Sequence, residues 1–256
     1  MIDEGQPFQS FFSKHAEDYA KSRSHASGPD LAALIEALRP RTSELALDVA
    51  TGTGFTAVSL AVRVKHVTGI DLTEEMLDQA RGFARSRGVA NIEFERGDAM
   101  KLDFPNSSLD IVTTRRAEHH FHDVPRFLRE AKRVLKAGGR IGVVDMSPPE
   151  GAGSFTNRIE KLRDGSHVEA FTLKAWESMI VGAGFGGLTS RVLADRVTFE
   201  RWLYPVEPGG KEEKAILSAW RSSSKAVRRL LKAEFDGDRI SAWSKTRIVL
   251  VASKTP

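Results

Sequence analysis

The feature that most constrains this chain is a glycine-containing turn between two apolar runs, LDVATGTGFTAVSLA at residues 47–61. The first run is typical of a buried strand, and the run after the turn is typical of a helix. Gly52, Gly54 and Ala57 fit the G-x-G-x-x-G/A spacing of a dinucleotide fold. No Gly-Lys-Ser/Thr follows, which argues against the phosphate-binding loop of a nucleoside triphosphatase. The turn therefore predicts a site where a ligand rests against bare backbone.

Strands and helices alternate in the first 146 residues. Strand-like runs rich in Val, Ile and Leu occur at residues 45–50, 66–71, 92–96, 109–114 and 140–145. Amphipathic helical runs lie between them at 74–86 and 124–136. We expect Thr73 and Asp123 to cap these helices and Gly138-Gly139 to end the second. Alternation of this kind predicts a parallel sheet wound by right-handed crossovers.

The pattern changes after residue 146. A helix near 173–183 and a strand near 188–198 precede a basic amphipathic segment at 211–233 and a last strand at 247–253. We expect this last strand to return to the core sheet, so that the chain forms one domain. Its predicted parts are an N-terminal helical lid (1–40), a cofactor-binding core (41–146), a substrate-side region with an insertion (147–246) and a last strand with a tail (247–256).

The composition excludes several classes of function. The chain has no cysteine, so it has no disulfide, no thiolate metal site and no cysteine nucleophile. No apolar stretch reaches the roughly 18 residues of a membrane span, and the N-terminus is too polar for a signal peptide. We therefore expect a cytoplasmic monomer or homodimer. The formal net charge of +4 gives little support for a polyanionic partner, because the basic excess is confined to residues 211–233.

Acidic residues at the predicted strands favour an adenosyl sulfonium over a dinucleotide as the ligand. Asp48 lies in the first strand, where its carboxylate can approach a cationic amino group, whereas an anionic pyrophosphate gains nothing from an acid there. Asp71 ends the second strand, in the place of the acid that binds ribose. Asp98 follows the third strand, where a carboxylate can accept a hydrogen bond from an adenine amino group.

In these motifs the sequence resembles the class I S-adenosylmethionine-dependent methyltransferases. The resemblance is strongest to the small-molecule branch that includes the ubiquinone and menaquinone C-methyltransferases and their uncharacterised relatives. It lies in LDVATGTGFTA, GIDLTEEMLDQAR, the stretch from GDAMKLDF to GGRIGVVD, and AGF. It covers residues 44–146 strongly and the flanks loosely. Ala50 departs from the commonest form of the loop, which has a glycine there, but a small residue still lets a cofactor approach.

The resemblance implies the fold and the activity. The expected fold is a Rossmann-like, doubly wound, mostly parallel seven-stranded α/β sheet with one antiparallel strand and helices on both faces. The expected reaction is transfer of a methyl group from S-adenosylmethionine to a small-molecule acceptor by in-line displacement. The acceptor atom must be held close to the methyl group, so a single essential base is not required by the chemistry.

The resemblance also implies the cofactor site. Gly52 and Gly54 would admit the methionine portion against bare backbone, and Asp71 would accept hydrogen bonds from the ribose. Asp98 would receive the adenine, and Arg115 would contact the methionine end. The implied cofactor-binding residues are Tyr19, Asp48, Ala50, Gly52, Gly54, Asp71, Leu72, Met76, Asp98, Ala99, Met100 and Arg115.

Some of these residues also have a purely structural interpretation. Asp71 can cap a helix, the apolar residues that follow it can belong to the core, and Arg115 can form a surface salt bridge. The segment FFSKHAEDYAKSR looks like the helix that closes over the cofactor in relatives. In that interpretation Tyr19 would cover the methionine portion and Arg23 would meet its carboxylate.

Histidines supply the candidate catalytic groups. His119 and His120 lie in AEHHFHD, and His167 lies in RDGSHVEAF. An imidazole titrates near neutral pH, so each is a candidate general base beside the transferred methyl group. Asp145, at the end of the fifth predicted strand, also lies where relatives place the substrate. We expect no metal site, because adjacent histidines point apart and no thiol is present.

Three other functions are left open by the sequence. An NAD(P)-dependent oxidoreductase would use the loop and Asp71, but it would leave Asp48 and Gly97-Asp98 without a role. A methyltransferase acting on nucleic acid rests only on residues 211–233, whose basic side chains are also consistent with a solvated helix face, and we expect no nucleic-acid partner. A binding module would hold the cofactor without turnover.

Overall fold

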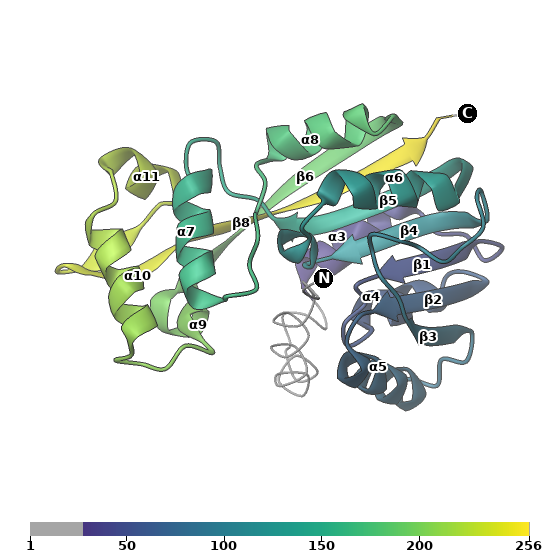
Figure 1. The fold of residues 1–256 in the computed structure, drawn as a ribbon, viewed down its shortest axis with the longest axis horizontal. Coiled ribbons are helices and arrows are strands. Elements are labelled where there is room, and N and C mark those ends of the chain that lie inside the picture. The colour runs from purple at the N-terminus through teal and green to yellow at the C-terminus, as the bar shows by residue number, and fades with distance from the viewer. Residues whose placement is uncertain (1–27, 256) are drawn as a thin grey trace, which may run out of the picture.

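Figure 1 shows the computed structural model, which describes residues 28–255. Its strands are β1 (Leu45–Val49), β2 (His66–Asp71), β3 (Ile92–Arg96), β4 (Leu109–Arg115), β5 (Leu135–Met146), β6 (Phe185–Thr198), β7 (Glu234–Asp236) and β8 (Arg239–Lys254). They form one sheet of order β3-β2-β1-β4-β5-β8-β6, and β7 pairs with β8 off this path. The strands from β3 to β5 are parallel, whereas β8 is antiparallel to β5 and β6. The predicted fold class is confirmed, with β7 as a short addition.

Helices cover both faces of this sheet. In the described part of the chain they are α3 (Pro29–Leu38), α4 (Phe55–Ala61), α5 (Glu74–Ser86), the 3₁₀ turn η1 (Glu118–His120), α6 (Val124–Val134), α7 (Gly153–Arg163), α8 (Leu173–Gly182), α9 (Phe199–Leu203), α10 (Lys211–Arg221) and α11 (Lys225–Leu230). The apolar sides of α6 and α8 contribute to one core cluster, and those of α3 and α4 contribute to another. The sheet therefore lies between two apolar layers.

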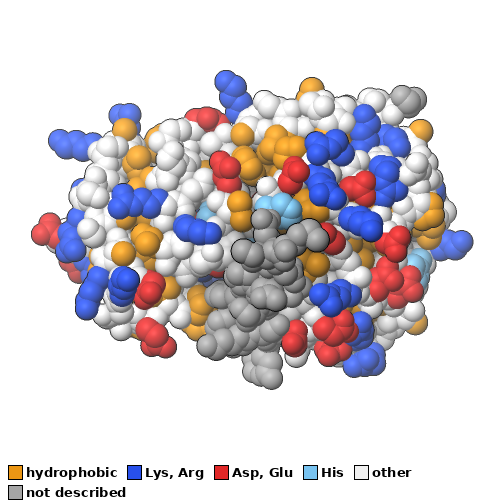
Figure 2. Space-filling model, in the orientation of Figure 1, with side chains coloured by type: hydrophobic (Ala, Val, Ile, Leu, Met, Phe, Trp, Pro, Cys, Tyr) orange, Lys and Arg blue, Asp and Glu red, His pale blue; other side chains and the backbone are white. Residues whose placement is uncertain are grey.

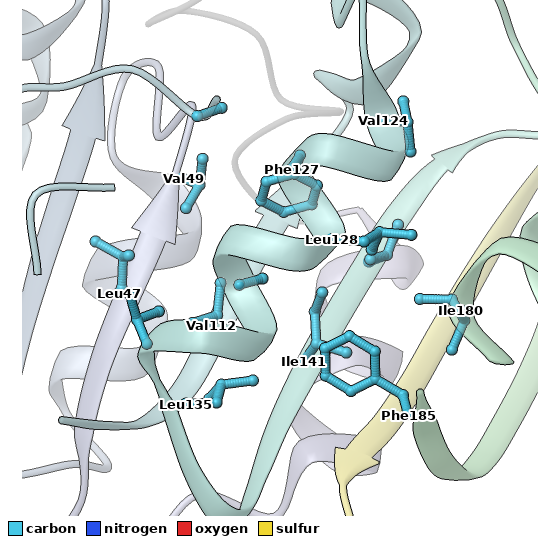
Figure 3. Close-up of a cluster of buried hydrophobic side chains, with 14 of the residues drawn as sticks. Leu47, Val49, Val112, Val124, Phe127, Leu128, Leu135, Ile141, Ile180 and Phe185 are labelled. Atoms are coloured by element: carbon cyan, nitrogen blue, oxygen red, sulfur yellow. The ribbon is translucent and has the colours of Figure 1, made fainter. Parts of the chain in front are cut away.

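The core layer under α6 illustrates how the apolar pattern positions a helix. Phe127 and Leu128 of α6 lie beside Leu47, Val112 and Ile141 from β1, β4 and β5 (Figure 3). All five are essentially inaccessible to solvent. Burial of one such side chain contributes about 1.5–3 kcal/mol. This layer fixes β1 and β4 next to each other, so their carboxyl ends open at one edge of the sheet.

The predicted end of the helix at 124–136 was wrong. α6 ends at Val134, and Gly138-Gly139 lie inside β5. Leu135 already pairs with Leu109 of β4, and the register then shifts before pairing resumes with Ile111. The glycine pair accommodates an irregularity in the strand, because a Cβ at Gly139 would lie 2.9 Å from a backbone oxygen.

The two predicted helix caps differ in the structure. The Asp123 carboxylate accepts a hydrogen bond from the Arg126 amide at 2.8 Å, so that prediction is confirmed. Thr73 occupies the N-cap position of α5, but its hydroxyl makes no capping hydrogen bond. The Asp71 carboxylate instead accepts from the Thr73 amide at 3.0 Å. Asp71 is therefore oriented by the start of α5 without being its N-cap residue.

β6 and β8 extend beyond the main sheet and carry a second lobe, which consists of α7, α9, α10, α11, β7 and residues 239–246 of β8. β5 pairs with β8 only over Arg247–Ser253, whereas β6 remains paired as far as Ala242. The lobe lies at the left of Figure 1 and has its own apolar cluster. Trp243 of β8 lies at the centre of that cluster, with ring centroids 5.0 Å from Trp202 and 5.1 Å from Trp220.

The basic segment at 211–233 forms two helices of this lobe. Ile216 and Trp220 of α10 are completely buried in its core, so the basic residues of α10 lie on the outer side. Arg228 of α11 lies over the Phe235 ring and donates to the Trp220 and Arg221 carbonyl groups. Basic and acidic side chains are interspersed over the lobe on the face drawn in Figure 2. The apolar residues of segment 211–233 are therefore explained by packing in the lobe, and its basic residues by exposure to solvent.

Candidate functional site

The carboxyl ends of β1, β2 and β4 surround a hollow with about 650 Å³ of empty space, part of it open to solvent. The turn between β1 and α4 forms one wall, and the residues that follow β4 form another. Parallel strands present their carboxyl ends at the same edge of a sheet, which is where open α/β sheets bind ligands. The hollow is lined by these predicted site residues: Asp48, Ala50, Gly52, Asp71, Met76, Arg115 and His120.

Gly52 and Asp71 form the centre of the site. The Gly52 amide donates to one oxygen of the Asp71 carboxylate at 2.9 Å, and the Thr73 amide donates to the other at 3.0 Å. These contacts hold the carboxylate at the end of β2 facing the glycine turn. Burial raises the pKa of Asp71, and the backbone donors oppose that shift. Lone pairs left on both oxygens can accept from a vicinal diol, as the predicted ribose contact requires.

The glycine turn gives a direct test of fit for a cofactor. A Cβ at Gly52 would meet no protein atom within 4 Å, so the backbone at this position faces empty space. A Cβ at Gly54 would lie 2.9 Å from Cβ of Ala80 and 3.1 Å from the Phe94 ring. Gly52 therefore leaves room for a ligand, whereas Gly54 allows α4 to pack closely on α5 and β3.

Alanine substitutions at these two glycines are expected to separate binding from stability. Gly54→Ala should lower the free energy of unfolding by about 2–4 kcal/mol, from the clash and the left-handed backbone at φ +82°. Gly52→Ala should cost about 1 kcal/mol of stability but weaken about tenfold the binding of S-adenosylhomocysteine, the product form of the cofactor that the resemblance implies. Urea unfolding and calorimetric titration measure the two effects. Equal loss of affinity in two equally stable variants would contradict this assignment.

Asp48 is a buried carboxylate in the wall of the hollow, only 1% exposed. The hydroxyl groups of Thr51 and Thr113 each donate to it at 2.7 Å. Burial raises its pKa to about 6, although the two hydroxyl groups and the Arg115 charge lower it. A cationic ligand group nearby would stabilise the ionised form. Asp48 is therefore suited to an ammonium group, as the sequence predicts.

Arg115, the last residue of β4, and Arg116 directly after it supply positive charge to the same wall. The Arg115 side chain is 5% exposed, donates to the Thr56 hydroxyl at 2.9 Å and lies 3.3 Å from the Asp30 carboxylate. Arg116 donates to both oxygens of Asp30, at 2.8 and 3.0 Å. Burial lowers the pKa of Arg115 to about 10, so it stays cationic. Its ion pair with Asp30 is buried, whereas the structural alternative considered from the sequence was a salt bridge at the surface.

Asp30 of α3 is completely buried between these arginines. Burial alone would raise its pKa, but hydrogen bonding from Arg116 and the charges of Arg115, Arg116 and Arg247 hold it down at about 2. No local sequence pattern predicts this contact, because Asp30 lies 85 residues before Arg115. Other lining residues absent from the prediction are Thr51, Thr53, Phe55, Thr56, Arg116 and Ala117.

Other predicted cofactor residues lie outside the lining of the hollow. Asp98 is exposed, and its carboxylate accepts from the Met100 amide at 2.8 Å. Ala99 and Met100 belong to the core cluster below α6. Leu72 is half-buried. The contacts of these residues with adenine stay predictions, as does the contact of Gly54 with the methionine portion of the cofactor. Tyr19 and Arg23 lie outside the described residues.

The three predicted catalytic histidines form a buried cluster beside the hollow. The ring centroids of His119 and His120 are 4.1 Å apart, and those of His119 and His167 are 5.6 Å apart. Nδ1 of His119 lies 2.7 Å from the Asp145 carboxylate. Nε2 of His167 lies 2.8 Å from the side-chain oxygen of Asn157 on α7. The structure thus brings together residues from η1, β5 and the segment after α7.

The described residues also bear on metal binding and on membrane insertion. Within residues 28–255, no group of three or more His, Asp or Glu side chains is placed to hold a metal ion. No helix in this part of the chain is both long and apolar enough to cross a membrane.

Comparisons with known proteins agree with the geometry of the site. A family model described as "Methyltransferase domain" matches residues 47–143. The uncharacterized methyltransferase YcgJ of Bacillus subtilis is 41% identical over 170 residues, which cover 66% of this chain and 67% of YcgJ. The demethylmenaquinone methyltransferase of Deinococcus radiodurans is 38% identical over 154 residues, which cover 57% of this chain and 63% of that protein. The YcgJ crystal structure superposes with a TM-score of 0.84 at 30% identity, covering 89% of this chain and 98% of YcgJ.

The sheet, the glycine turn and the acid at the end of β2 are those of a methyltransferase, and the chain belongs to the class I S-adenosylmethionine-dependent methyltransferases. Within this family it is related to YcgJ and to the demethylmenaquinone methyltransferases. Its methyl donor is S-adenosylmethionine. The resemblance found in the sequence is confirmed, and the oxidoreductase alternative is set aside.

Proposed function

We propose that this methyltransferase acts on a small-molecule acceptor that binds where the cofactor hollow meets the histidine cluster. One observation carries the proposal. Ala117 and His120 line the hollow, and the turn that joins them also holds His119 beside Asp145. One short segment after β4 therefore contributes both to the wall of the hollow and to the polar side chains that can contact an acceptor.

In this proposal the chain's own residues orient the methyl donor. Asp71 would accept from the ribose hydroxyls, and bare backbone at Gly52 would allow the donor to approach. Asp48 would face its ammonium group, and Arg115 would face its carboxylate. When bound, S-adenosylmethionine supplies a methyl group on a positively charged sulfur, which needs no further activation. The protein's task is to align the acceptor atom with the methyl carbon and to exclude water.

Two observations support a small-molecule acceptor: the acceptor for which relatives are named, and the packing of the basic segment in the second lobe. Demethylmenaquinone methyltransferases are named for a quinone acceptor, and one of them is 38% identical to this chain over 154 residues. A nucleic-acid acceptor has little support, because the apolar side of α10 is buried in the core of the lobe. A cytoplasmic location and a monomeric or homodimeric state stay predictions from the sequence.

The test of the proposed function is binding followed by turnover. Calorimetric titration with S-adenosylmethionine, S-adenosylhomocysteine and NADH should give micromolar binding of the two adenosyl compounds and no binding of NADH. Formation of S-adenosylhomocysteine is then measured with quinols, phenols and amines as acceptors. Binding of NADH alone would contradict the proposal, and binding of the donor without turnover on any acceptor would favour a binding module.

The raised pKa of Asp48 predicts a pH dependence of cofactor binding. With its pKa at about 6 in the free protein, this carboxyl is mostly ionised at pH 7 and mostly protonated at pH 5. An ammonium group prefers the carboxylate, so affinity for S-adenosylhomocysteine should fall about tenfold between pH 7 and pH 5. Titration at both pH values measures this. Asp48→Asn should bind more weakly with a flat profile, and a flat profile for the wild type would refute the idea.

A further inference from the structure

A buried glutamate lies on the 3₁₀ turn that follows β4, next to the wall of the cofactor hollow. Glu118 is the first residue of η1, and it is completely inaccessible to solvent. Ala117, directly before it, and His120, two residues after it, both line the hollow. The turn that forms this wall therefore also carries a carboxyl group in the protein interior.

One oxygen of this carboxyl group has no partner. The Ala117 amide donates to Oε2 of Glu118 at 3.0 Å. Oε1 is buried and forms no hydrogen bond, and no Lys, Arg or His side chain within residues 28–255 forms an ion pair with Glu118. A buried carboxylate without a counter-ion is strongly disfavoured, so the group is held as the neutral acid.

Two other acids strengthen this preference for the neutral form. β1, β4 and β5 are neighbours in the sheet (Figure 1), and η1 follows the middle strand of the three. The charges of Asp145 on β5 and Asp48 on β1 both act on Glu118. Burial, followed by the Asp145 charge, raises the pKa of Glu118 well above its usual value. Glu118 is therefore neutral at pH 7.

The positive groups near these strand ends act on the other two acids. Nδ1 of His119 lies 2.7 Å from the Asp145 carboxylate, and the charge of Asp145 also acts on Lys245 of β8. Burial raises the pKa of Asp48, and the Arg115 charge is among the groups that oppose the shift. Burial lowers the pKa of the other two histidines of the cluster, which stay neutral at pH 7. A cation that favours the ionised form of Glu118 therefore comes from a ligand.

The methyl donor carries such a cation. S-adenosylmethionine has a positive charge on its sulfur, whereas S-adenosylhomocysteine has none there. In-line transfer requires the bond from sulfur to the methyl group to point toward the acceptor. With the acceptor where the hollow meets the histidine cluster, as in the proposed function, the sulfur lies beside η1. A positive charge placed within a few ångströms of a carboxyl group favours its ionised form.

From these contacts, and resting on the proposed function, we propose that Glu118 distinguishes the methyl donor from its product. S-adenosylmethionine binds with release of the Glu118 proton to solvent, and the carboxylate then faces the sulfonium. S-adenosylhomocysteine binds with the proton retained. Once the methyl group has been transferred, the sulfur is neutral, and Glu118 takes a proton back from solvent. The attraction that favoured the donor is thereby lost, which favours release of the product.

Proton release on binding is the direct measurement. Calorimetric titration in two buffers of different ionisation enthalpy counts the protons. Between pH 6 and pH 7 the amino groups of both ligands are mostly protonated, and Asp48 meets the same ammonium group in each, so a comparison of the two ligands cancels both effects. Wild type should release about one more proton with S-adenosylmethionine than with S-adenosylhomocysteine. Its affinity for the donor relative to the product should then fall about tenfold from pH 7 to pH 6.

Two variants assign this proton to one residue. Glu118→Gln keeps the shape of the neutral acid and cannot ionise. It should bind S-adenosylhomocysteine within twofold of the wild type, bind S-adenosylmethionine about tenfold more weakly, and release no extra proton with the donor. Glu169→Gln is the matched control, because Glu169 is exposed and its amide donates to the His119 carbonyl group beside the same turn. It should bind both ligands like the wild type. Circular dichroism shows whether each variant is folded.

The outcomes separate this proposal from the proposed function. Equal proton release with the two ligands, and an affinity ratio that is independent of pH, would refute it from the wild type alone, even if Glu118→Gln did not fold. A difference in proton release that persists in Glu118→Gln would belong to another group, and an equal loss of both affinities would show a purely structural role. In each of these cases the proposed function stands. If neither adenosyl compound binds the wild type, the proposed function fails, and this proposal fails with it.

Discussion

Replacing Asp71 with alanine is expected to abolish measurable binding of S-adenosylhomocysteine. A hydrogen bond to a charged group contributes about 1.5–3 kcal/mol, so loss of both ribose contacts should weaken binding by about 100-fold or more. The substitution also frees the Gly52 amide, which donates to Asp71 at 2.9 Å and thereby helps to hold the turn. Calorimetric titration of the purified variant measures the effect.

Two further variants distinguish loss of the ribose contact from general damage. Asp71→Asn keeps the size of the side chain, and its remaining carbonyl oxygen can accept one hydrogen bond, so its affinity should lie between those of wild type and Asp71→Ala. Asp78→Ala removes an exposed acid of α5 that pairs with Arg81 on the surface, and should bind like wild type. Undiminished affinity in a folded Asp71→Ala would show that the acid at the end of β2 does not hold the ribose.

The cofactor half of the fold could be predicted because its signals are local. β2, β3 and α5 begin and end where the apolar pattern places them. Asp48, Gly52 and Asp71 come to one hollow because each lies at or just after a parallel strand, and parallel strands end at the same edge. The end of α6 was predicted wrongly because a glycine pair can either end a helix or accommodate an irregularity in a strand. The strand pairing between Leu109 and Leu135 decides between these two structures.

The contacts between distant segments could not be predicted. Nothing in the local sequence indicates that Asp30 pairs with Arg116. Nor does it indicate that Asp145 pairs with His119 and not with the adjacent His120. The second lobe depends on the length of β6 and β8, which pair across residues 185–198 and 242–254. Within β8, only residues 247–253 were visible as a strand-like run, because the half of β8 inside the lobe is mixed in polarity.

Glu160 of α7 carries the largest stability effect that we expect in the second lobe. One of its oxygens accepts from Lys245 at 2.6 Å and from the Trp202 indole at 3.1 Å, and the other accepts from Arg163 at 3.0 Å. Glu160 itself is 2% exposed. Removing one partner of a buried ion pair costs about 3–5 kcal/mol, because it leaves the opposite charge uncompensated.

Glu160→Gln is therefore expected to lower the free energy of unfolding by about 3 kcal/mol, the low end of that range. The low end applies because the Lys245 and Arg163 side chains are 20% and 19% exposed and can turn toward water. Chemical denaturation at pH 7 measures the loss. Glu200→Gln, an exposed acid on α9, is the matched control and should change stability by less than about 0.5 kcal/mol. Equal stabilities for the two variants would show that the buried pair contributes nothing net.

The pH dependence of this difference tests its electrostatic origin. Burial would raise the pKa of Glu160, but the charges of Lys245 and Arg163 outweigh burial and hold it below its usual value. A carboxyl group with a lowered folded-state pKa stabilises the protein above its unfolded pKa of about 4.3, and that stabilisation is lost as the pH falls. The wild type should therefore begin to lose its advantage over Glu160→Gln near pH 5 and continue to lose it as the pH falls toward the folded-state pKa. If the difference stayed constant down to pH 3, the shape of the side chain, not its charge, would account for the effect.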